Sequence, residues 1–553
     1  MKTKFIFVTG GVVSGLGKGV CAASIGYLLK SRGYSVFSMK LDPYLNVNPG
    51  IISPIEHGEV FVTDDGTETD LDLGYYERFI GTNLTKDSSF TSGKLYQNLW
   101  KKESEGIYKG KTLQIVPHFT NEVQEVILNI EKKYNPDFAI IEIGGSVGDL
   151  ESNPFFYSIA QLNYLYPDNM FFVHISFVPF LEVSKEYKSK PTQHSIEKLR
   201  SLGINPNIVI LRSHNFVTQD IINKISKISF LNIENIFNVP DIDIVYKIPL
   251  YLEEKNIVKI ITNHFNLKNH NANLNSWHNF VKNIENKDKQ NINIAMCGKY
   301  ASFEDSYKSI KEALMIAAGY EKVNVNFIWI DLLKLTPKEI IEILKSNNIN
   351  GIIALPGKEY TGWDNETLIA NYGRKNNIPT LGICWGFQAM VIDCLKENNP
   401  NIESIEFIKE TKIKNPLFIT EKVQKYNEID FNVRIGQRKI KLNNNTLINK
   451  IYDAKEILER HKHKFCIPYH LVKQYENNNI IFSSLSENGE IVESFEIKDH
   501  PFYLGVQFHP EYNVKVLAPG NLFRTFLKST KQIIKINNKE KWWKKIKIIK
   551  IHY

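Results

Sequence analysis

Residues 5–29 read FIFVTGGVVSGLGKGVCAASIGYLL, and their pattern predicts the fold of the first part of the chain. A short apolar run leads into a glycine-rich segment, and a helical pattern follows directly, which is the order strand, loop, helix that a phosphate-binding loop requires. In such a loop, backbone N–H groups close around phosphate oxygens, the helix N-terminus attracts negative charge, and a lysine, here Lys18, adds a positive charge. The glycine spacing differs from the standard Walker pattern, so the alternative is a chance glycine-rich turn.

The alternation of apolar runs and helical patterns continues outward from this stretch. Short β-rich runs at 3–10, 34–40 and 138–144 are separated by helical patterns, which predicts a parallel sheet with helices on both faces. Near residue 265 the chain becomes polar and Asn-rich, and the alternation then restarts. We therefore predict two doubly wound α/β domains, with 1–265 as the first domain, 266–291 as a linker, 292–528 as the second domain and 529–553 as a basic tail.

Composition and charge narrow the class of protein. The 553 residues are 43% hydrophobic and 23% charged, and no apolar run is long enough to span a bilayer, so we expect a cytoplasmic protein of several domains. Five scattered cysteines without a CxxC pair predict neither a disulfide framework nor a zinc site.

The positive charge of the chain lies in its last residues. Residues 528–553 hold nine lysines and one glutamate, and their net charge of +8 equals that of the whole chain. This tail is either a solvated extension or a surface for RNA, an anionic membrane or a partner.

Gly19 follows Lys18 where most phosphate loops have a Ser or Thr for the metal. Carboxylates are therefore expected to supply the ligands, and the candidates are Asp70 and Asp72 in ETDLDLG and Glu142 at the end of an apolar run. The carboxyl end of a parallel strand lies at the crevice where such folds bind ligands, and Mg²⁺ typically takes one or two carboxylates plus phosphates. Each carboxylate taken alone could also be a solvated loop residue.

Two further stretches carry possible chemistry. In KSKPTQHS, Lys188 and Lys190 are placed to clamp a second polyphosphate, or they belong to a charged surface loop.

In PTLGICWGFQ, Cys384 stands between an apolar strand and a helix, which is the pattern of a nucleophile elbow with Cys in place of Ser. Downstream, QFHPEY supplies His509 as a base and Glu511 as its orienting carboxylate, so these three residues predict a triad for acyl transfer through a thioester. A buried structural cysteine is the alternative.

The chain resembles the CTP synthase family over nearly all of residues 1–528. The resemblance lies in strings such as GGVVSGLGKG, MKLDPYLNVNPG, EIGGSVGDLESNPF, KPTQHS, LGICWGFQ and QFHPEY. It implies a dethiobiotin-synthetase-like P-loop amidoligase domain followed by a class I glutamine amidotransferase domain. The implied reaction is ATP-dependent amination of UTP to CTP through 4-phospho-UTP, with ammonia released from glutamine at Cys384, His509 and Glu511.

The resemblance also assigns binding residues. For ATP it implies Gly15, Leu16, Gly17, Lys18, Gly19, Val20, Lys40, Asp72, Arg212, Asp241, Ile242 and Asp243. For UTP or CTP it implies Ser14, Asp149, Leu150, Glu151, Lys188, Lys190, Gln193 and Lys227, and for glutamine Gly357, Trp385, Gly386, Phe387, Gln388, Glu406 and Lys464. Asp72 and Glu142 are implied as Mg²⁺ ligands. The resemblance further implies GTP as an activator, CTP as a feedback inhibitor and a homotetramer.

The chain departs from the family in the second domain. The oxyanion loop LPGKEYTGW is one residue and two glycines shorter than the family's P-G-G-F-G-Y-R-G, and Lys464 stands where the family has an arginine that grips the glutamine carboxylate. Lysine cannot form the bidentate fork of arginine. The alternatives to a glutamine-using enzyme are therefore a synthase with an impaired glutaminase that depends on free ammonia, or a mainly structural, filament-forming protein.

Overall fold

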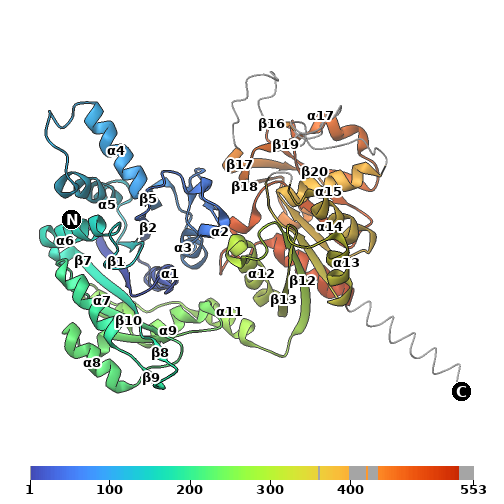
Figure 1. Ribbon diagram of the computed structural model, residues 1–553. Helices are drawn as coiled ribbons and strands as arrows, with labels where there is room; N and C mark the ends of the chain where they lie inside the picture. Colours follow the sequence, from blue (N-terminus) through green and yellow to red (C-terminus); the bar gives the residue numbers. More distant parts are fainter. Residues whose placement is uncertain (1, 359–360, 398–418, 421–433, 535–553) are drawn as a thin grey trace, which may run out of the picture. The chain divides into compact units, whose positions relative to one another are not determined.

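The structure is a computed structural model that describes residues 2–358, 361–397, 419–420 and 434–534 (Figure 1). The chain divides into two compact units. Unit 1 comprises Met1–Ile51 and Thr69–Val281, and unit 2 comprises Ile52–Glu68 and Lys282–Tyr553. Within the described ranges, no helix has the length and apolar character needed to cross a membrane.

Unit 1 is built on a sheet with strand order β11-β10-β7-β1-β6-β2-β5, in which every described pair of neighbours is parallel. Its strands are β1 (Lys4–Gly11), β2 (Val36–Asp42), β5 (Ser89–Thr91), β6 (Phe138–Ile143), β7 (Met170–Phe177), β10 (Ile208–Ser213) and β11 (Ile236–Pro240), with a separate hairpin of β8 (Phe180–Leu181) and β9 (Glu186–Tyr187). Its helices are α1 (Lys18–Lys30), α3 (Asp72–Ile80), α4 (Ser92–Ser104), α5 (Thr120–Tyr134), α6 (Asn153–Leu165), α7 (Lys190–Ser201), α8 (Gln219–Ser229), α9 (Ile248–Glu254), α10 (Ile257–His264) and α11 (Asn275–Glu285), the last of which runs into unit 2.

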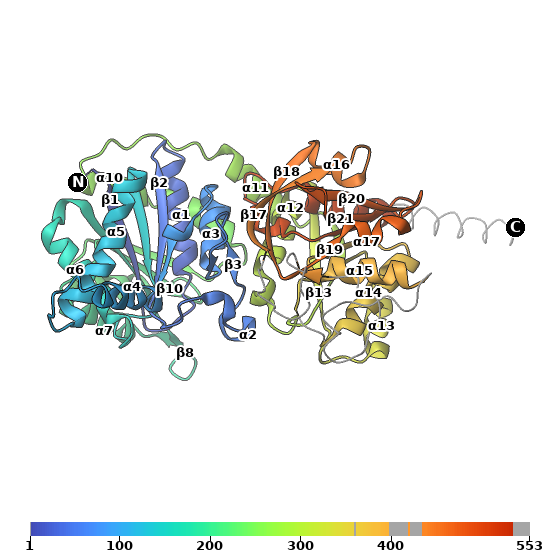
Figure 2. The same ribbon diagram turned by 90° about the horizontal axis from the view of Figure 1, so that it is seen from above.

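Helices cover both faces of this sheet, with α4 and α5 on one side and α1 and α3 on the other (Figure 2). Phe5 and Phe7 of β1 belong to the same buried core as Val123 of α5 and Phe155 of α6. On the opposite face, Gly26 of α1 lies so close to its neighbours that a Cβ there would be 2.5 Å from the Ile80 side chain of α3. The buried, apolar strands therefore follow from a sheet that is covered on both faces.

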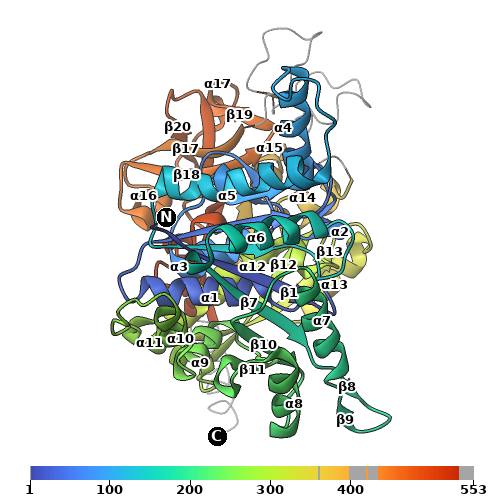
Figure 3. The same cartoon turned by 90° about the vertical axis from the view of Figure 1, so that its left-hand side faces the viewer.

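Parallel pairing brings the carboxyl ends of β1, β2, β6 and β7 to one edge of the sheet. The glycine-rich loop leaves β1 at this edge, and α7 begins there after the β8–β9 hairpin, which projects from the body of unit 1 (Figure 3). Ligands of open α/β sheets bind at this edge.

Unit 2 contains a larger mixed sheet with strand order β13-β12-β14-β15-β22-β21-β20-β17-β18. The neighbours from β13 to β22 are parallel, and those from β22 to β18 are antiparallel. The strands are β3 (Phe61–Val62), β4 (Glu68–Thr69, which reaches into unit 1), β12 (Gln290–Gly298), β13 (Val323–Asp331), β14 (Gly351–Ala354), β15 (Thr380–Ile383), β16 (Ile419–Thr420), β17 (Arg434–Leu442), β18 (Glu456–His463), β19 (Phe465–Pro468), β20 (Ile480–Ser486), β21 (Ile491–Ile497) and β22 (Tyr503–Val506). The helices are α2 (Pro54–His57), α12 (Lys308–Glu321), α13 (Pro337–Ser346), α14 (Trp363–Lys375), α15 (Trp385–Lys396), α16 (Leu447–Tyr452) and α17 (Tyr469–Val472).

Segment 52–68 belongs to unit 2, although it lies early in the chain. The Glu59 carboxylate accepts a hydrogen bond of 2.9 Å from the Ser309 N–H, and Asp64 pairs with the buried Arg460 at 2.6 Å. The predicted first domain 1–265 is continuous, whereas unit 1 is interrupted by this segment. These contacts join residues hundreds of positions apart, so no local pattern indicates them.

Candidate functional site

The glycine-rich loop of unit 1 has an open concave backbone. Gly15 and Gly17 have φ of 72° and 79°, a left-handed conformation that favours glycine, and a Cβ built at either would meet nothing within 4 Å. Gly17 is the N-cap of α1, and no side chain caps the first turn of that helix. Ser14 is exposed, and Leu16 is buried beneath the loop. The loop therefore presents backbone N–H groups beside open space, as a phosphate site requires.

Lys18 is held at the start of α1. Its ammonium donates a hydrogen bond to the Gly145 carbonyl, and its stem packs on Gly10, where a Cβ would be 2.7 Å from Cδ. Burial lowers the pKa of Lys18, and the Glu142 carboxylate opposes that shift. The lysine is thus a largely desolvated positive charge next to the loop.

Gly19 explains how the loop works without a Ser or Thr. A Cβ at Gly19 would lie 2.4 Å from an Asp72 carboxylate oxygen, so the absence of a side chain there makes room for that carboxylate. Val20, the next residue of α1, is buried. A carboxylate therefore occupies the place where other loops have their metal-binding hydroxyl.

Lys40, at the end of β2, is surrounded by carboxylates. Its Nζ lies 2.5 Å from Asp72 Oδ2, 2.8 Å from Asp70 Oδ1 and 3.4 Å from Asp42 Oδ1. Burial alone would lower the pKa of Lys40, but these three carboxylates raise it well above its ordinary value. The sequence did not single out Asp42, although its place at the end of a strand, in MKLDPY, is the same signal that identified Glu142.

Glu142 completes this cluster at the end of β6. Tyr76 of α3 donates a hydrogen bond to its carboxylate, and only 2% of Glu142 is exposed. Burial, together with the Asp72 charge, raises the pKa of Glu142 to about 8. Tyr76 was not among the predicted residues, because an aromatic residue in a helix is usually read as core.

The other predicted ATP residues lie at the ends of β10 and β11. Arg212 donates hydrogen bonds to the carbonyls of Val239 and Pro240, at 2.9 and 2.7 Å, and pairs with Asp241 at 3.1 Å. Asp241 and Asp243 are exposed, and Ile242 is half-buried. The structure thus brings Arg212 and Asp241 together at the edge of the sheet where β10 and β11 end.

The predicted pyrimidine-nucleotide residues fall into three places. Lys190 and Gln193 lie in the first turns of α7, and Lys188 just before it is paired with Glu186. Asp149, Leu150 and Glu151 are exposed in the loop between β6 and α6. Lys227 lies in the last turn of α8, which runs from the end of β10 back towards the start of β11. It is therefore at the opposite edge of the sheet from the loop, and unit 1 does not bring it to the others.

Cys384 of unit 2 occupies a strained turn between β15 and α15. Its φ of 55° and ψ of −103° are rare for a residue with a side chain. Gly382 and Gly386 make the turn possible: a Cβ at Gly382 would be 2.3 Å from Met390 Sδ, and one at Gly386 would be 2.2 Å from the Ala354 carbonyl. Cys384 is therefore the N-cap of α15, with its sulfur beside the N-terminus of the helix, as in a nucleophile elbow.

His509 and Glu511 lie beside this cysteine. His509 Nδ1 is 2.7 Å from Glu511 Oε1, and both side chains are buried. Burial alone would lower the pKa of His509, but the Glu511 carboxylate and the Cys384 sulfur raise it to about 10. The three predicted triad residues are therefore brought together, with the imidazole favoured as a cation.

The shortened loop after β14 packs directly on the elbow. A Cβ at Gly357 would be 2.7 Å from the Trp385 ring, so glycine is needed here for space. Lys299, which is buried and lies over the Trp385 ring at 5.5 Å, donates a hydrogen bond to the Lys358 carbonyl. Lys299 thus fixes the backbone of the loop at Lys358 next to the Trp385 ring. It was missed in the sequence, where GKY after a strand carried no recognised signal.

The remaining predicted glutamine residues lie around the start of α15. Trp385 and Phe387 are buried, and Gln388 donates to the Gln507 side chain at 3.0 Å and to the Phe465 carbonyl at 3.3 Å. Lys464 is exposed between β18 and β19. Glu406 lies outside the described residues, as does most of the basic tail.

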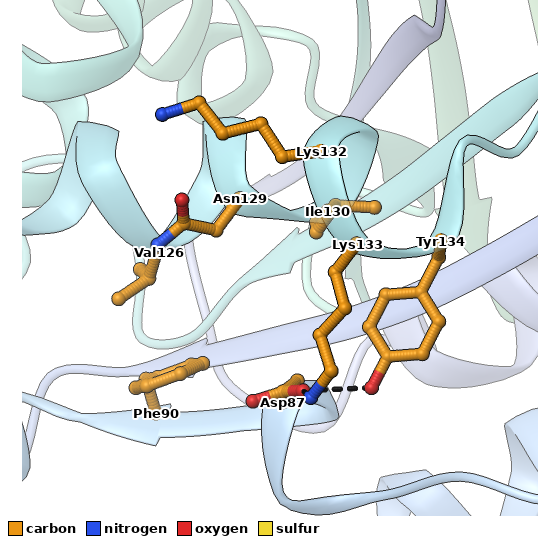
Figure 4. Close-up of a pocket in the computed structure, with 8 residues that line it drawn as sticks. All are labelled: Asp87, Phe90, Val126, Asn129, Ile130, Lys132, Lys133 and Tyr134. Carbon is orange, nitrogen blue, oxygen red and sulfur yellow. Dashed lines mark hydrogen bonds and ion pairs between the residues drawn. The ribbon is translucent and has the colours of Figure 1, made fainter.

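A separate cavity of about 320 Å³ lies in unit 1 between the edge strand β5 and α5. Figure 4 shows Phe90 on one wall, with Lys133 and Tyr134 both directed at Asp87. None of the predicted site residues lines this cavity. It is therefore distinct from the two sites described above.

The two units together define a class of protein. A parallel α/β unit with a glycine-rich loop and buried lysines is typical of an ATP-using synthetase, and a Cys–His–Glu constellation at a strand-to-helix turn is typical of a glutaminase. One chain that carries both is a glutamine-dependent amidotransferase.

Known proteins narrow the class to one family. A family profile described as CTP synthase N-terminus matches residues 4–267, and one described as Glutamine amidotransferase class-I matches residues 302–529. The chain is 46% identical to a CTP synthase of Mycoplasmopsis pulmonis (strain UAB CTIP) over 530 residues, which is 95% of this chain and 98% of that protein. It is 41% identical to a CTP synthase of Aquifex aeolicus (strain VF5), with the same shares covered.

The chain belongs to the CTP synthase family, and its function is that of a glutamine-hydrolysing ligase that makes CTP. Among solved structures, the glutaminase domain of a Trypanosoma brucei CTPS with bound acivicin matches with 24% identity and a TM-score of 0.40, covering 44% of this chain and 94% of that one. The family profiles and the α/β sheets of the two units confirm the family and the fold class that the sequence predicted. The ammonia-only and structural alternatives are not favoured.

Proposed function

We propose that unit 1 activates UTP with ATP and that Cys384 of unit 2 supplies ammonia from glutamine. The observation that carries this proposal is the strained turn at Cys384, next to the His509–Glu511 pair, in a chain that also has an open phosphate-type loop. ATP would phosphorylate O4 of UTP, which turns a poor leaving oxygen into phosphate, and ammonia would displace that phosphate at C4.

In the glutaminase half, the Cys384 thiolate attacks the amide carbon of glutamine. The raised pKa of His509 supports an imidazolium that can give a proton during the reaction. His509 gives its proton to the departing ammonia and then takes one from the water that hydrolyses the thioester. Glu511 holds the imidazole in orientation through Nδ1.

Backbone N–H groups would stabilise the oxyanion of this step. The N–H of Trp385 at the start of α15 and the loop at Gly357 and Lys358 are the candidates. The Lys299 contact with the Lys358 carbonyl supports a loop that is fixed despite its lost glycines. Lys464 carries one ammonium where the family has a guanidinium, so it would hold the glutamine carboxylate with fewer hydrogen bonds.

In the synthetase half, the residues present fit a magnesium ion. Four carboxylates, Asp42, Asp70, Asp72 and Glu142, interact with two ammonium groups, those of Lys18 and Lys40, which leaves a formal charge of −2. Among the described residues, no group of three or more His, Cys, Asp or Glu could hold a metal alone. We therefore propose Asp72 and Glu142 as ligands, with phosphates and water as the others.

When bound, Mg²⁺ would neutralise part of the charge of the phosphates during transfer. Lys18 would contact the phosphates of ATP from the N-terminus of α1, and the loop N–H groups would hold them in line. Lys40 would keep Asp70 and Asp72 in place while approaching phosphate itself. Arg212, Asp241, Ile242 and Asp243 would hold the rest of ATP at the ends of β10 and β11.

For UTP we propose that Lys188, Lys190 and Gln193 hold the triphosphate and that Asp149, Leu150 and Glu151 contact the base and sugar. Lys227 could join them only from a second copy of the chain, because it lies at the other edge of its own sheet. The exposed Tyr164 and Leu165 at the end of α6, 84% and 56% accessible, support self-association of this kind. That the assembly is a homotetramer is proposed on family membership.

Four further features are proposed on family membership. They are GTP as an activator, CTP as a feedback inhibitor, ATP with Mg²⁺ as the working nucleotide complex and a cytoplasmic location. The function as a whole is tested by following CTP production while ATP, UTP, Mg²⁺ or the nitrogen donor is left out in turn. CTP should form only in the complete mixture, and CTP formation without ATP would contradict the proposal.

A further inference from the structure

Three buried side chains form a hydrogen-bonded line beneath the glycine-rich loop of unit 1. Thr9 Oγ1 of β1 is 3.0 Å from His174 Nδ1 of β7, and His174 Nε2 is 2.9 Å from Ser195 Oγ of α7. Thr9 and His174 are fully buried, and Ser195 is 7% exposed. None of the three belongs to the catalytic or binding residues proposed above.

The direction of each hydrogen bond follows from the neighbours. The Thr9 hydroxyl lies 3.4 Å from the Val173 carbonyl, to which it can only donate, so it accepts from His174 Nδ1–H. His174 Nε2 then carries the lone pair, and the Ser195 hydroxyl donates to it. Burial, with the nearby Lys18 charge, lowers the pKa of His174 to about 3, so the imidazole stays neutral and keeps this arrangement.

Ser195 is also in contact with the beginning of the loop. A Cβ at Gly11 would lie 1.6 Å from Ser195 Oγ and 3.2 Å from His174 Cε1. Gly11 has no positive φ in the structure, so glycine is required here for space rather than for backbone conformation. The position of Ser195 therefore fixes where the loop leaves β1.

The same helix carries the residues assigned to the second nucleotide. Ser195 lies two residues after Gln193 and five after Lys190, on the first turns of α7. A shift of α7 relative to Gly11 would change the distance between the loop that holds ATP and the residues that hold the UTP triphosphate. Thr192 of the same helix is buried too, but its hydroxyl donates to the Phe177 carbonyl at 2.9 Å and does not take part in the line.

We propose that His174 and Ser195 are positioning residues that hold the ATP loop and the UTP end of α7 at a fixed separation, so that binding of one nucleotide favours binding of the other. This inference rests on the proposed function of unit 1. It assigns no chemistry to the imidazole, which acts only through Ser195 and Gly11.

The test measures coupling between the two nucleotides. The ligand is adenylyl imidodiphosphate with Mg²⁺; this ATP analogue does not transfer its terminal phosphoryl group. Its Kd is determined with and without saturating UTP, and the ratio of the two Kd values is the coupling factor. We expect Ser195→Ala to lower this factor about five- to tenfold, which is the usual effect of one buried hydrogen bond, and Thr9→Val to lower it in the same direction. Thr192→Val, which removes a buried hydroxyl from the same helix, should keep the wild-type factor.

The outcomes separate the inference from the function on which it rests. Wild-type coupling in Ser195→Ala, or an equal loss in Thr192→Val, would overturn the positioning role while both nucleotides still bind. A wild-type protein that binds neither nucleotide would overturn the proposed function of unit 1 and this inference with it. Binding of the ATP analogue without UTP, measured on each full-length variant, should be retained and reports that unit 1 is folded, and glutamine hydrolysis reports the same for unit 2.

Discussion

His509 links one proton in the glutaminase site to the stability of unit 2. Its pKa is raised from 6.5 to about 10, so the protonated imidazole stabilises the folded state. This stabilisation is fully present below pH 6.5 and is lost as the pH rises through about 10. We expect the wild type to lose on the order of a few kcal/mol more than His509→Gln over this range, seen in thermal unfolding midpoints.

The matched control for this prediction is His470→Gln, because His470 is exposed on α17 of the same unit. Its midpoint should fall with pH in parallel with the wild type. If the midpoint of His509→Gln also follows that of the wild type, the folded protein does not hold the imidazole of His509 as a cation, which contradicts the prediction.

The loop between β1 and α1 needs glycine at Gly17, and we predict what alanine does there. Gly17 and Gly33 have φ of 79° and 89°, and a Cβ built at either meets nothing within 4 Å. Alanine at either position should cost about 1–2 kcal/mol of stability, since both must remain left-handed. Only Gly17→Ala places a methyl group in the space assigned to phosphate, so only this variant should raise the KM for ATP, by about tenfold or more.

Steady-state kinetics at varied ATP and chemical denaturation of both variants check this prediction. Gly33→Ala, which shares the backbone conformation but lies in an exposed turn after α1, is the reference. Equal KM values for ATP in the two variants would mean that the loop at Gly17 does not face the phosphates.

Elements that depend on neighbouring residues could be predicted from the sequence. The loop, α1 and the turn at Cys384 are each coded by adjacent glycines and apolar residues, and all three form as expected. The carboxylates around Lys40 were only partly predicted. Asp42 is buried because β2 pairs with β6, a strand about a hundred residues further along the chain. The Thr9–His174–Ser195 line was missed for the same reason, since it joins two strands and a helix.

At the scale of the whole molecule, the least predictable feature is the assignment of segment 52–68 to unit 2. Arg460 has a fully buried side chain and donates to Asp64 Oδ1 at 2.6 Å and to the Val62 carbonyl at 3.1 Å. The two residues of this ion pair are 396 positions apart in the chain, so composition and periodicity cannot predict it. A domain boundary drawn at a change of composition cannot detect an exchange of this kind.

This feature predicts that Asp64→Asn destabilises unit 2. Removing the charge that faces the buried guanidinium should cost about 1.5–3 kcal/mol, the usual value of a hydrogen bond to a charged group. The neighbouring Asp65→Asn, at an exposed position with bonds to nearby threonines, should cost less. The measurement is the temperature at which glutaminase activity is lost, and equal values for the two variants would argue against a structural role of the segment in unit 2.

CTP formation from UTP, ATP and Mg²⁺ shows whether two reactions in the two units share ammonia. The assay compares glutamine with ammonium chloride for the wild type, Cys384→Ala and the control Cys394→Ala, a buried cysteine of the same helix. We predict that the wild type and Cys394→Ala use both donors, and that Cys384→Ala loses glutamine-dependent activity about a thousandfold or more but keeps the ammonia-dependent reaction. Glutamine-dependent synthesis by Cys384→Ala, or a wild type that makes no CTP from either donor, would contradict this mechanism.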